Sequence, residues 1–195
     1  PAKFRTEVRF LYDNTGLYVG ATLYDPYPDS IPCQLGLRDA NSLNADNFIV
    51  MLSPFNDGLN AFCFMVYSSD VQVDFKLSGA NENDDYSWDA VWASKARRNE
   101  TGWVVEMKIP YSAIRFPLKP VQEWGLNCQR SLRRYREIDT WNLVDAKVSG
   151  YVNQSGLLEG IKNVKPPLRL SVSPYLSGYV QNSQEDKNYD FSYNF

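Results

Sequence analysis

Apolar and polar residues alternate in short segments along most of the chain, and turn-forming residues separate the segments. A period of two is typical of β-strands that bury one face. The segments in which we expect strands are residues 4–10, 17–24, 33–37, 48–53, 60–67, 71–77, 88–96, 103–109, 123–132 and 140–144. Residues 48–53 are apolar almost throughout, which indicates a strand buried on both faces. Because no pattern predicts a long amphipathic helix, we expect an all-β fold, an antiparallel β-sandwich or barrel.

The stretch SWDAVWASKARRNETGWVVEMKIPYSAIRFP, residues 87–117, is the hairpin around which we expect the core to form. Its first strand is expected to place Trp88 and Trp92 on one face, and Gly102 in the following turn can adopt a positive φ. The return strand is expected to place four apolar side chains on one face, namely Trp103, Val105, Met107 and Ile109. Pro110 cannot donate a ladder hydrogen bond, so we expect the strand to end there.

Length, charge and residue content restrict the functions open to this protein. A chain of 195 residues is long enough for one well-buried domain, and a net charge of −3 gives no electrostatic basis for binding nucleic acid. No run approaches the roughly 18 apolar residues of a transmembrane helix. The absence of histidine excludes Ser-His-Asp and Cys-His catalytic sets and zinc sites built on histidine. We interpret the widely spaced Cys33, Cys63 and Cys128 as small core residues.

Pro166 and Pro167 mark an expected boundary between a β-sandwich domain, residues 1–165, and a second segment, residues 166–195. Beyond the boundary, residues 168–180 and 189–195 alternate afresh. A weakly amphipathic hairpin with aromatic residues near its ends is typical of the start of a transmembrane β-barrel. It would equally fit one more hairpin packed on the sandwich, and the pattern alone leaves both interpretations open.

Several segments resemble the amino-terminal domain of a family of bacterial envelope proteins. In that family, a module like the family 9 carbohydrate-binding modules precedes an outer-membrane-type β-barrel. The segments that carry the resemblance are TEVRFLYDNTGLYVGATLYDPYPDSI (6–31), LRDANSLNADNF (37–48), the hairpin of residues 87–117 and WGLNCQRSLRRYRE (124–137). The segment PPLRLSVSPYLSG (166–178) looks like the point where the barrel begins.

This resemblance implies an immunoglobulin-like β-sandwich without catalytic activity, located in the cell envelope of a Gram-negative bacterium and associated with the outer membrane. It implies binding of sugar chain ends between aromatic rings, a part in carbohydrate catabolism and, in some modules, structural calcium. The full-length protein is expected to carry a carboxy-terminal membrane barrel as the partner of this domain.

The candidate ligand-binding residues are Trp88, Trp92, Asp89 and Arg38. Two tryptophan rings on one strand face could stack on a sugar ring, and Asp89 and Arg38 could supply hydrogen bonds. The alternative is that both tryptophans are core residues, as tryptophan usually is. Trp141 and Tyr86 are lesser candidates for stacking.

Calcium is a candidate cofactor, because a hard cation needs about six or more oxygen ligands. Residues 81–85 (NENDD) with Asp89, or the Asp- and Asn-rich residues 39–46, could provide them, although neither has EF-hand spacing. A solvated polar loop is the alternative interpretation of both.

Catalysis has little support in the sequence. Asp89 and Glu106 could meet across the hairpin as a glycosidase carboxylate pair, but no second signature accompanies them. The basic residues Arg130, Arg133, Arg134 and Arg136 could contact an acidic surface or pair with the acidic residues that follow them. We therefore expect a non-catalytic, carbohydrate-binding module. The alternative is a structural or interaction domain that scaffolds the attached barrel and has no sugar site.

Overall fold

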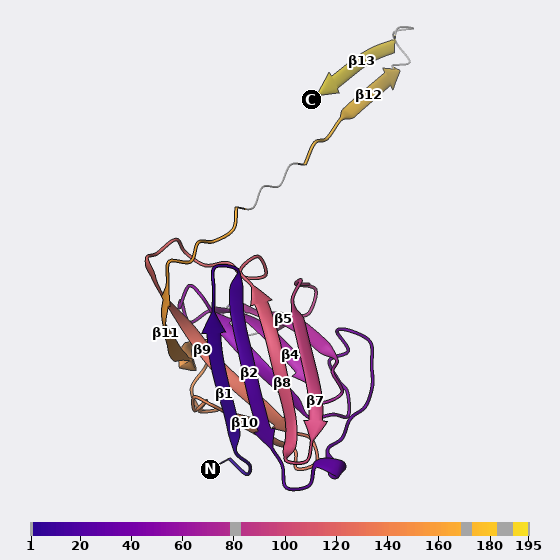
Figure 1. Ribbon diagram of the computed structural model, residues 1–195. Coiled ribbons are helices and arrows are strands. Elements are labelled where there is room, and N and C mark those ends of the chain that lie inside the picture. The colour runs from indigo at the N-terminus through magenta and orange to yellow at the C-terminus, as the bar shows by residue number, and fades with distance from the viewer. Residues whose placement is uncertain (1, 79–82, 169–172, 183–188, 195) are drawn as a thin grey trace.

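The computed structural model describes residues 2–78, 83–168, 173–182 and 189–194. Two antiparallel sheets pack face to face (Figure 1). The first sheet contains, in spatial order, β1 (Thr6–Tyr12), β2 (Gly16–Tyr24), β8 (Gly102–Pro110) and β7 (Ala93–Asn99). The second contains β10 (Glu137–Thr140), β9 (Val121–Leu132), β3 (Asn47–Ser53), β4 (Asn60–Tyr67), β5 (Gln72–Ser78) and β6 (Asn83–Asp85), with β11 (Gly156–Lys162) paired to β9. The expected antiparallel β-sandwich is confirmed.

The helices of the described residues are two single 3₁₀ turns, η1 (Pro28–Ser30) and η2 (Val152–Gln154). Within residues 2–78, 83–168, 173–182 and 189–194, no helix has the length and apolar character needed to cross a membrane.

The main core lies between the two sheets and includes the expected face of the hairpin. The side chains of Trp103, Val105, Met107 and Ile109 are all buried there, as the alternation predicts. Trp124 of β9 faces them from the opposite sheet and is also fully buried. The hairpin turn has the expected form, with φ of +140° at Gly102.

A second apolar cluster lies on the outer face of the larger sheet. Strands β3 and β4 contribute to both clusters, so the prediction of a strand buried on both faces is confirmed for residues 48–53. The outward-facing members include Met51, Cys63, Met65, Val73 and Phe75. This second cluster forms the floor of the cavity described below.

The strand expected over residues 88–96 begins later than predicted, at Ala93, the first residue of β7. The residues just before β7 instead donate hydrogen bonds to the buried carboxylate of Asp74. The Ala90 N–H donates to Asp74 Oδ2 at 2.7 Å, and Trp92 Nε1 donates to Asp74 Oδ1 at 2.9 Å. These bonds replace ladder bonds, so residues 88–92 cross between the sheets as an irregular segment. The strand predicted over residues 88–92 is therefore absent, although the rings of Trp88 and Trp92 still pack on the same side, both against Phe64.

Two other predicted strands are also absent from the described residues. Residues 33–37 contribute a single bridge, between Cys33 and Ala45. Residues 140–144 leave the ladder after β10, because the Asn142 N–H donates to the side chain of Asn127 at 3.0 Å and Asn142 Nδ2 donates to the Gln154 carbonyl at 2.6 Å. In the latter case side-chain hydrogen bonds replace the backbone pairing that alternation alone would predict.

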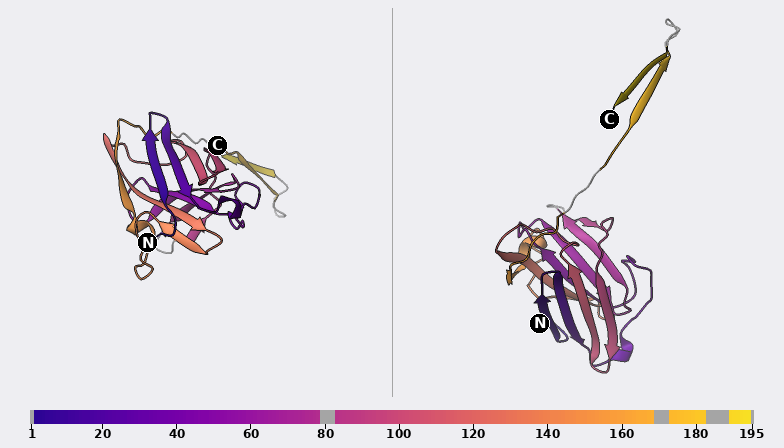
Figure 2. Two further views of the ribbon diagram at one scale, coloured as in Figure 1. Left: turned by 60° about the horizontal axis from the view of Figure 1, so that its bottom comes forward. Right: turned by 45° about the horizontal axis from the view of Figure 1, so that its top comes forward.

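Strands β12 (Ser177–Asn182) and β13 (Tyr189–Asn194) form a two-stranded sheet of their own. Figure 1 and the right-hand view of Figure 2 show this hairpin standing away from the sandwich. Part of the connection, residues 169–172, lies outside the described residues. The division at residue 165 and the identity of the second segment stay predictions.

The conformation of Gly102 yields a matched test of the fold. A Cβ at this position would lie 2.1 Å from the Leu23 carbonyl oxygen, whereas a Cβ at Gly20 of β2 would meet nothing within 4 Å. We expect Gly102→Ala to lower the free energy of unfolding by at least about 2 kcal/mol. Gly20→Ala should change it by less than about 1 kcal/mol. Urea denaturation of both variants measures the difference, and equal losses would contradict the described turn.

Candidate functional site

The structure brings Arg38, Asp89 and Trp92 together around the buried carboxylate of Asp74. Arg38 Nη2 donates to Asp74 Oδ1 at 2.5 Å and to Asp89 Oδ1 at 3.1 Å. The same Arg38 nitrogen donates to the Ala90 carbonyl at 2.8 Å. Burial raises the pKa of Asp74, although its hydrogen bonds from Trp92 and Ala90 and the Arg38 charge oppose the shift. This cluster ties the loop of Arg38 to β5 and to the segment before β7.

Of the two tryptophans of the candidate site, Trp92 lies in the hydrophobic core and Trp88 packs at the edge of that core. The Trp92 side chain is 7% exposed, and its ring packs edge-on against Phe64 at 5.1 Å between centroids. Trp88 is half-buried and packs on Phe62 at 5.1 Å, with Lys76 Nζ 5.1 Å from its ring centroid. Whether Trp88, Trp92, Asp89 and Arg38 contact a ligand stays a prediction.

The two lesser candidates are more accessible. Trp141 is 61% exposed, and its ring covers Gly156 of β11 so closely that a Cβ there would lie 2.4 Å from it. Tyr86 is 37% exposed, and its ring packs on Phe75 with 4.9 Å between centroids. The two rings belong to different cavities: Tyr86 lines one on the outer face of the larger sheet, and Trp141 lines one between the sheets.

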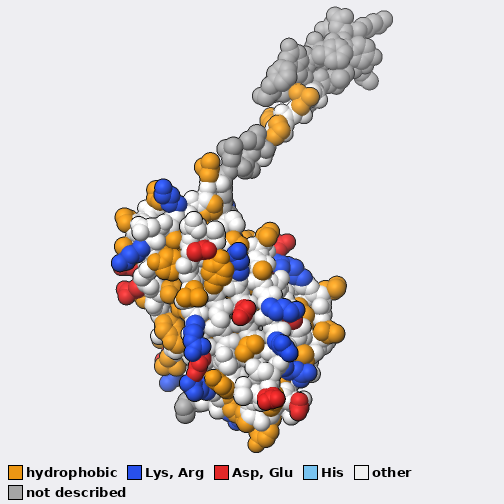
Figure 3. Space-filling view, viewed as in Figure 1, with side chains coloured by type: hydrophobic (Ala, Val, Ile, Leu, Met, Phe, Trp, Pro, Cys, Tyr) orange, Lys and Arg blue, Asp and Glu red, His pale blue; other side chains and the backbone are white. Residues whose placement is uncertain are grey.

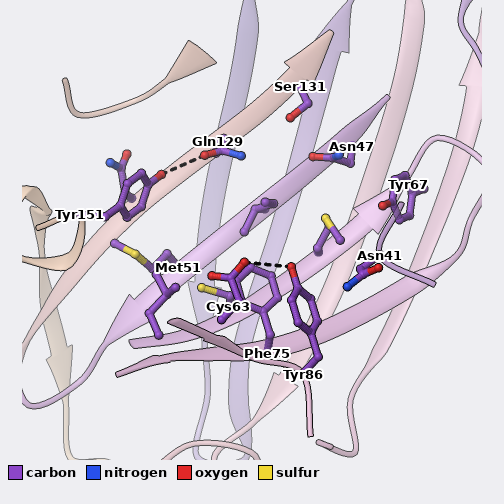
Figure 4. A pocket seen from close by; sticks show the side chains of 15 residues that line it. Asn41, Asn47, Met51, Cys63, Tyr67, Phe75, Tyr86, Gln129, Ser131 and Tyr151 are labelled. Carbon is purple, nitrogen blue, oxygen red and sulfur yellow. Dashed lines mark hydrogen bonds between the residues drawn. The ribbon is translucent and has the colours of Figure 1, made fainter. Parts of the chain in front are cut away.

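The cavity on the outer face of the larger sheet, called here the sheet-face cavity, has a volume of about 380 Å³ (Figure 4). Its floor is the second apolar cluster, and its rim carries amides, a hydroxyl and a carboxylate. The polar members are Asn41, Asn47, Asp84, Asn127, Gln129 and Ser131. Three tyrosines complete the wall, namely Tyr67, Tyr86 and Tyr151. These three come from β4, from the turn after β6 and from the residue before η2.

Strand register explains how the cavity acquires one polar and one apolar side. Asn47 of β3 lies opposite Ser131 of β9 on one flank and opposite Tyr67 of β4 on the other. One step along the sheet, Ile49 lies between Gln129 and Met65 in the same way. Side chains on one face recur every second residue, so β9 presents a row of polar groups and β4 a largely apolar row.

Hydrogen bonds hold several of the polar groups of the cavity in place. Tyr151 Oη donates to Gln129 Oε1 at 3.2 Å, and Tyr86 Oη donates to Asp84 Oδ2 at 3.1 Å (Figure 4). Asn127 holds the neighbouring loop in place, because its Nδ2 donates to the Asn142 carbonyl at 3.1 Å. Asn47 Oδ1 is buried and finds no hydrogen-bond partner among the described residues. A ligand hydroxyl could satisfy this acceptor.

The ionisable groups of the cavity favour binding over covalent chemistry. Burial raises the pKa of the Cys63 thiol well above its usual value, so it stays protonated at neutral pH and is a poor nucleophile. Burial raises the pKa of the Tyr86 phenol, and its bond to Asp84 acts in the same direction. Both groups are therefore uncharged at neutral pH.

Metal ligands are not gathered in the part of the chain that the structure describes, where no group of three or more Cys, Asp or Glu could hold an ion. Residues 81 and 82 of the predicted NENDD site lie outside the described residues. Calcium at either predicted loop stays a prediction.

The predicted basic stretch separates into different environments. Arg130 is 2% exposed and donates from Nη1 to the Arg5 carbonyl at 3.2 Å and from Nη2 to the Tyr24 carbonyl at 2.9 Å. Arg134 Nη2 donates to the buried Asp25 Oδ2 at 2.5 Å. Both side chains join structural elements, so the stretch does not act as one exposed basic surface.

Sequence reasoning missed the sheet-face cavity, although a signal for it was present. In residues 123–132, the alternation puts Trp124, Leu126 and Cys128 on one face, and the opposite face is polar, with Asn127, Gln129 and Ser131. Polar residues on the second face of a central strand indicate either solvent or a lined cavity. The tyrosine and asparagine contributions of distant loops have no comparable signal.

No family model matches this chain, and no curated protein sequence matches it. Its fold is similar to that of a candidate carbohydrate-binding protein from Bacteroides uniformis, with 12% identity and a TM-score of 0.66 over 82% of this chain and 79% of that chain. It is also similar to a family 9 carbohydrate-binding module from Caldicellulosiruptor kristjanssonii in complex with cellotriose, with 15% identity, a TM-score of 0.53 and coverage of 89% and 83%. The complex of such a module with glucose gives 18% identity, a TM-score of 0.50 and the same coverage. The chain therefore has an antiparallel β-sandwich fold of the family 9 type.

The Asp74 cluster yields a prediction about stability. Asp74→Ala removes the acceptor of two buried donors, so we expect the free energy of unfolding to fall by about 2–4 kcal/mol. Asp89→Ala, whose side chain is 78% exposed, should cost less than about 1 kcal/mol although it also contacts Arg38. Chemical denaturation of both variants tests this. An Asp89→Ala loss as large as that of Asp74→Ala would show that the exposed ion pair, not the buried carboxylate, secures the segment.

Proposed function

We propose that this protein is a non-catalytic carbohydrate-binding module and that the sugar occupies the sheet-face cavity. Sugars offer hydroxyl groups that both donate and accept hydrogen bonds, together with apolar faces of C–H groups. A binding site for them needs fixed amides, hydroxyls or carboxylates beside aromatic rings. The sheet-face cavity has this composition, and its volume of about 380 Å³ lies within the usual range for small-ligand sites.

The single observation that carries the proposal is the buried Oδ1 of Asn47, which has no hydrogen-bond partner in the described part of the chain and lies in a cavity rimmed by amides. A buried acceptor without a hydrogen bond costs about 1–3 kcal/mol. Nearby Gln129 and Ser131 lie on the adjacent strand, so one sugar ring could contact several of these groups at once. The solved complexes of the same fold with cellotriose and glucose support a sugar as the ligand class.

Aromatic stacking is assigned in this proposal to Tyr86 rather than to Trp88 and Trp92. The Tyr86 ring is backed by Phe75, which holds it at the cavity wall, and part of its surface is exposed. Tyr151 lines the same cavity and holds the Gln129 amide. The two tryptophans would then act indirectly, by supporting the core beneath the sheet.

We further propose a location in the cell envelope, with this domain preceding a membrane-embedded unit. The alternative function is a structural domain that scaffolds such a unit without binding sugar. The hairpin of β12 and β13, which pair with each other and stand apart from the sandwich, is compatible with an attached unit under both functions (Figure 1). The two candidate functions differ in whether the isolated sandwich has any glycan affinity.

A glycan array followed by isothermal titration calorimetry tests the sugar site. For a glycan that binds, Tyr86→Ala and Gln129→Ala should each raise the Kd by about fivefold or more, because each removes a ring contact or a hydrogen bond worth about 1 kcal/mol or more. Tyr27→Ala is the matched control, since Tyr27 is 61% exposed and lies outside the cavity. It should leave the Kd unchanged.

Other outcomes identify where the proposal fails. Glycan binding that survives both cavity substitutions but is lost in Trp88→Ala would move the site to the candidate pair inferred from the sequence. The absence of binding to plant, host and bacterial glycans, with circular dichroism showing an intact fold, would favour the scaffold function.

A further inference from the structure

A second cavity opens between the two sheets along the free edge of β1, and it is called here the edge opening. Its volume is about 840 Å³. One wall is formed by Val8 and Phe10 of β1, and the opposite wall by Leu157 and Leu158 of β11. The floor is the inward face of β9. Figure 3 shows hydrophobic side chains gathered on the side of the sandwich where β1 and β11 lie.

Hydrogen bonds join the two sheets at both ends of the edge opening and so define its length. At one end Tyr12 Oη donates to the Gly160 carbonyl at 3.1 Å and accepts from the Lys162 N–H at 3.3 Å. At the other end the Lys3 N–H donates to Glu137 Oε1 at 3.0 Å. The edge opening therefore extends along most of β1, which is seven residues long.

The backbone of β1 presents hydrogen-bonding groups along this edge that pair with no other strand of the described residues. The Tyr24 N–H donates to the Arg5 carbonyl and the Asp13 N–H donates to the Gly16 carbonyl, which makes the odd-numbered residues of β1 those that bond to β2. The N–H and carbonyl groups of the even-numbered residues point outward. Val8 and Phe10 thus direct their side chains into the edge opening and their backbone groups to its free edge.

Two polar atoms inside the edge opening also lack a hydrogen-bond partner among the residues that the structure describes. Arg130 is 2% exposed, and its Nε is buried without an acceptor. Asp139 lies opposite Arg130 in the β9–β10 register, and its Oδ2 is buried without a donor. Both residues line the edge opening, whose other lining residues are largely apolar. A side chain that accepts and donates, such as an amide or a hydroxyl, could satisfy both atoms.

We propose that the edge opening receives an extended peptide segment, which adds to the four-stranded sheet as a strand beside β1. Such a segment would pair its backbone with the outward groups of Val8 and Phe10 and place alternate apolar side chains into the edge opening. One of its inward positions would be Asn, Gln, Ser or Thr, which would bond Arg130 Nε and Asp139 Oδ2. Strand addition of this kind is a common mode of peptide recognition.

An extended peptide fits these observations better than a small amphiphilic molecule. An acyl chain or an aromatic compound could fill the apolar space, and a polar head could contact Arg130 Nε. It would leave the row of outward N–H and carbonyl groups on β1 unpaired. Exposed edges of this kind readily recruit another strand. The regular spacing of those groups matches a backbone, which offers donors and acceptors with the same period.

The test uses the full chain, labelled with ¹⁵N, and a library of synthetic nine-residue peptides in which every second residue is apolar and one inward position is Asn. We expect the best-binding peptide to slow amide hydrogen exchange at Val8 and Phe10 by at least about tenfold. The amides of Glu7 and Arg9, which face β2, are internal controls and should not change. A version of the same peptide with N-methyl groups on the backbone positions that face β1 should lose binding.

A variant of the protein provides an independent check. Val8→Arg places a long charged side chain in the edge opening and should abolish binding of the peptide. Arg9→Ser should leave binding unchanged, because the Arg9 side chain points away from the edge opening. If Val8→Arg does not fold, the N-methylated peptide still separates backbone pairing from apolar burial.

Three results would overturn the proposal. The first is that no peptide of the library protects the Val8 and Phe10 amides. The second is that the N-methylated peptide binds as well as its parent. The third is that dodecyl maltoside, used as an amphiphilic probe, binds in the edge opening and displaces the peptide without protecting those amides, which would identify a site for small amphiphiles.

Discussion

The burial of β3 and β4 on both faces is the constraint on which the rest of the structure depends. Inward side chains such as Val50 and Phe64 pack against the four-stranded sheet, whereas Met51 and Cys63 point to the other side. A sheet with two apolar faces needs a cover on each. The four-stranded sheet covers one face. The loops that carry Tyr86 and Tyr151 cover the other face only in part, and the sheet-face cavity is the space that remains.

Two buried charged residues connect elements that the apolar core alone would not position. Asp74 accepts hydrogen bonds from Arg38, Ala90 and Trp92. Arg130 donates to carbonyl groups of β2 and of the residue before β1. A buried charge is strongly unfavourable unless hydrogen bonds compensate it, so each of these groups specifies the position of its partners. Arg38 and Trp92 lie together because both donate hydrogen bonds to Asp74. The sheet-face cavity lies on the other face of the same sheet.

Strand β9 shows how one segment can supply two kinds of surface. Its outward residues, such as Gln129, line the sheet-face cavity, and its inward residues, such as Cys128 and Arg130, form the floor of the edge opening. A substitution on one face of this strand is therefore separated from the other face by the sheet itself. The sandwich fold supports binding sites at several places, so the fold alone does not define the ligand. The ligand of each cavity depends on the side chains that line it.

The sequence by itself determined the all-β architecture, the position of most strands and the inward face of β8. Period-two alternation and turn residues such as Gly102 depend on local geometry, which a sequence records directly. Local patterns could not reveal that Ala90 and Trp92 donate hydrogen bonds to Asp74, because these residues meet only through the tertiary fold. The same holds for the sheet-face cavity, whose polar rim joins residues from β3, β6, β9 and the loop of Asn41. The tertiary structure decided which aromatic rings became core and which remained accessible, because burial depends on packing between segments rather than on the order of residues within one.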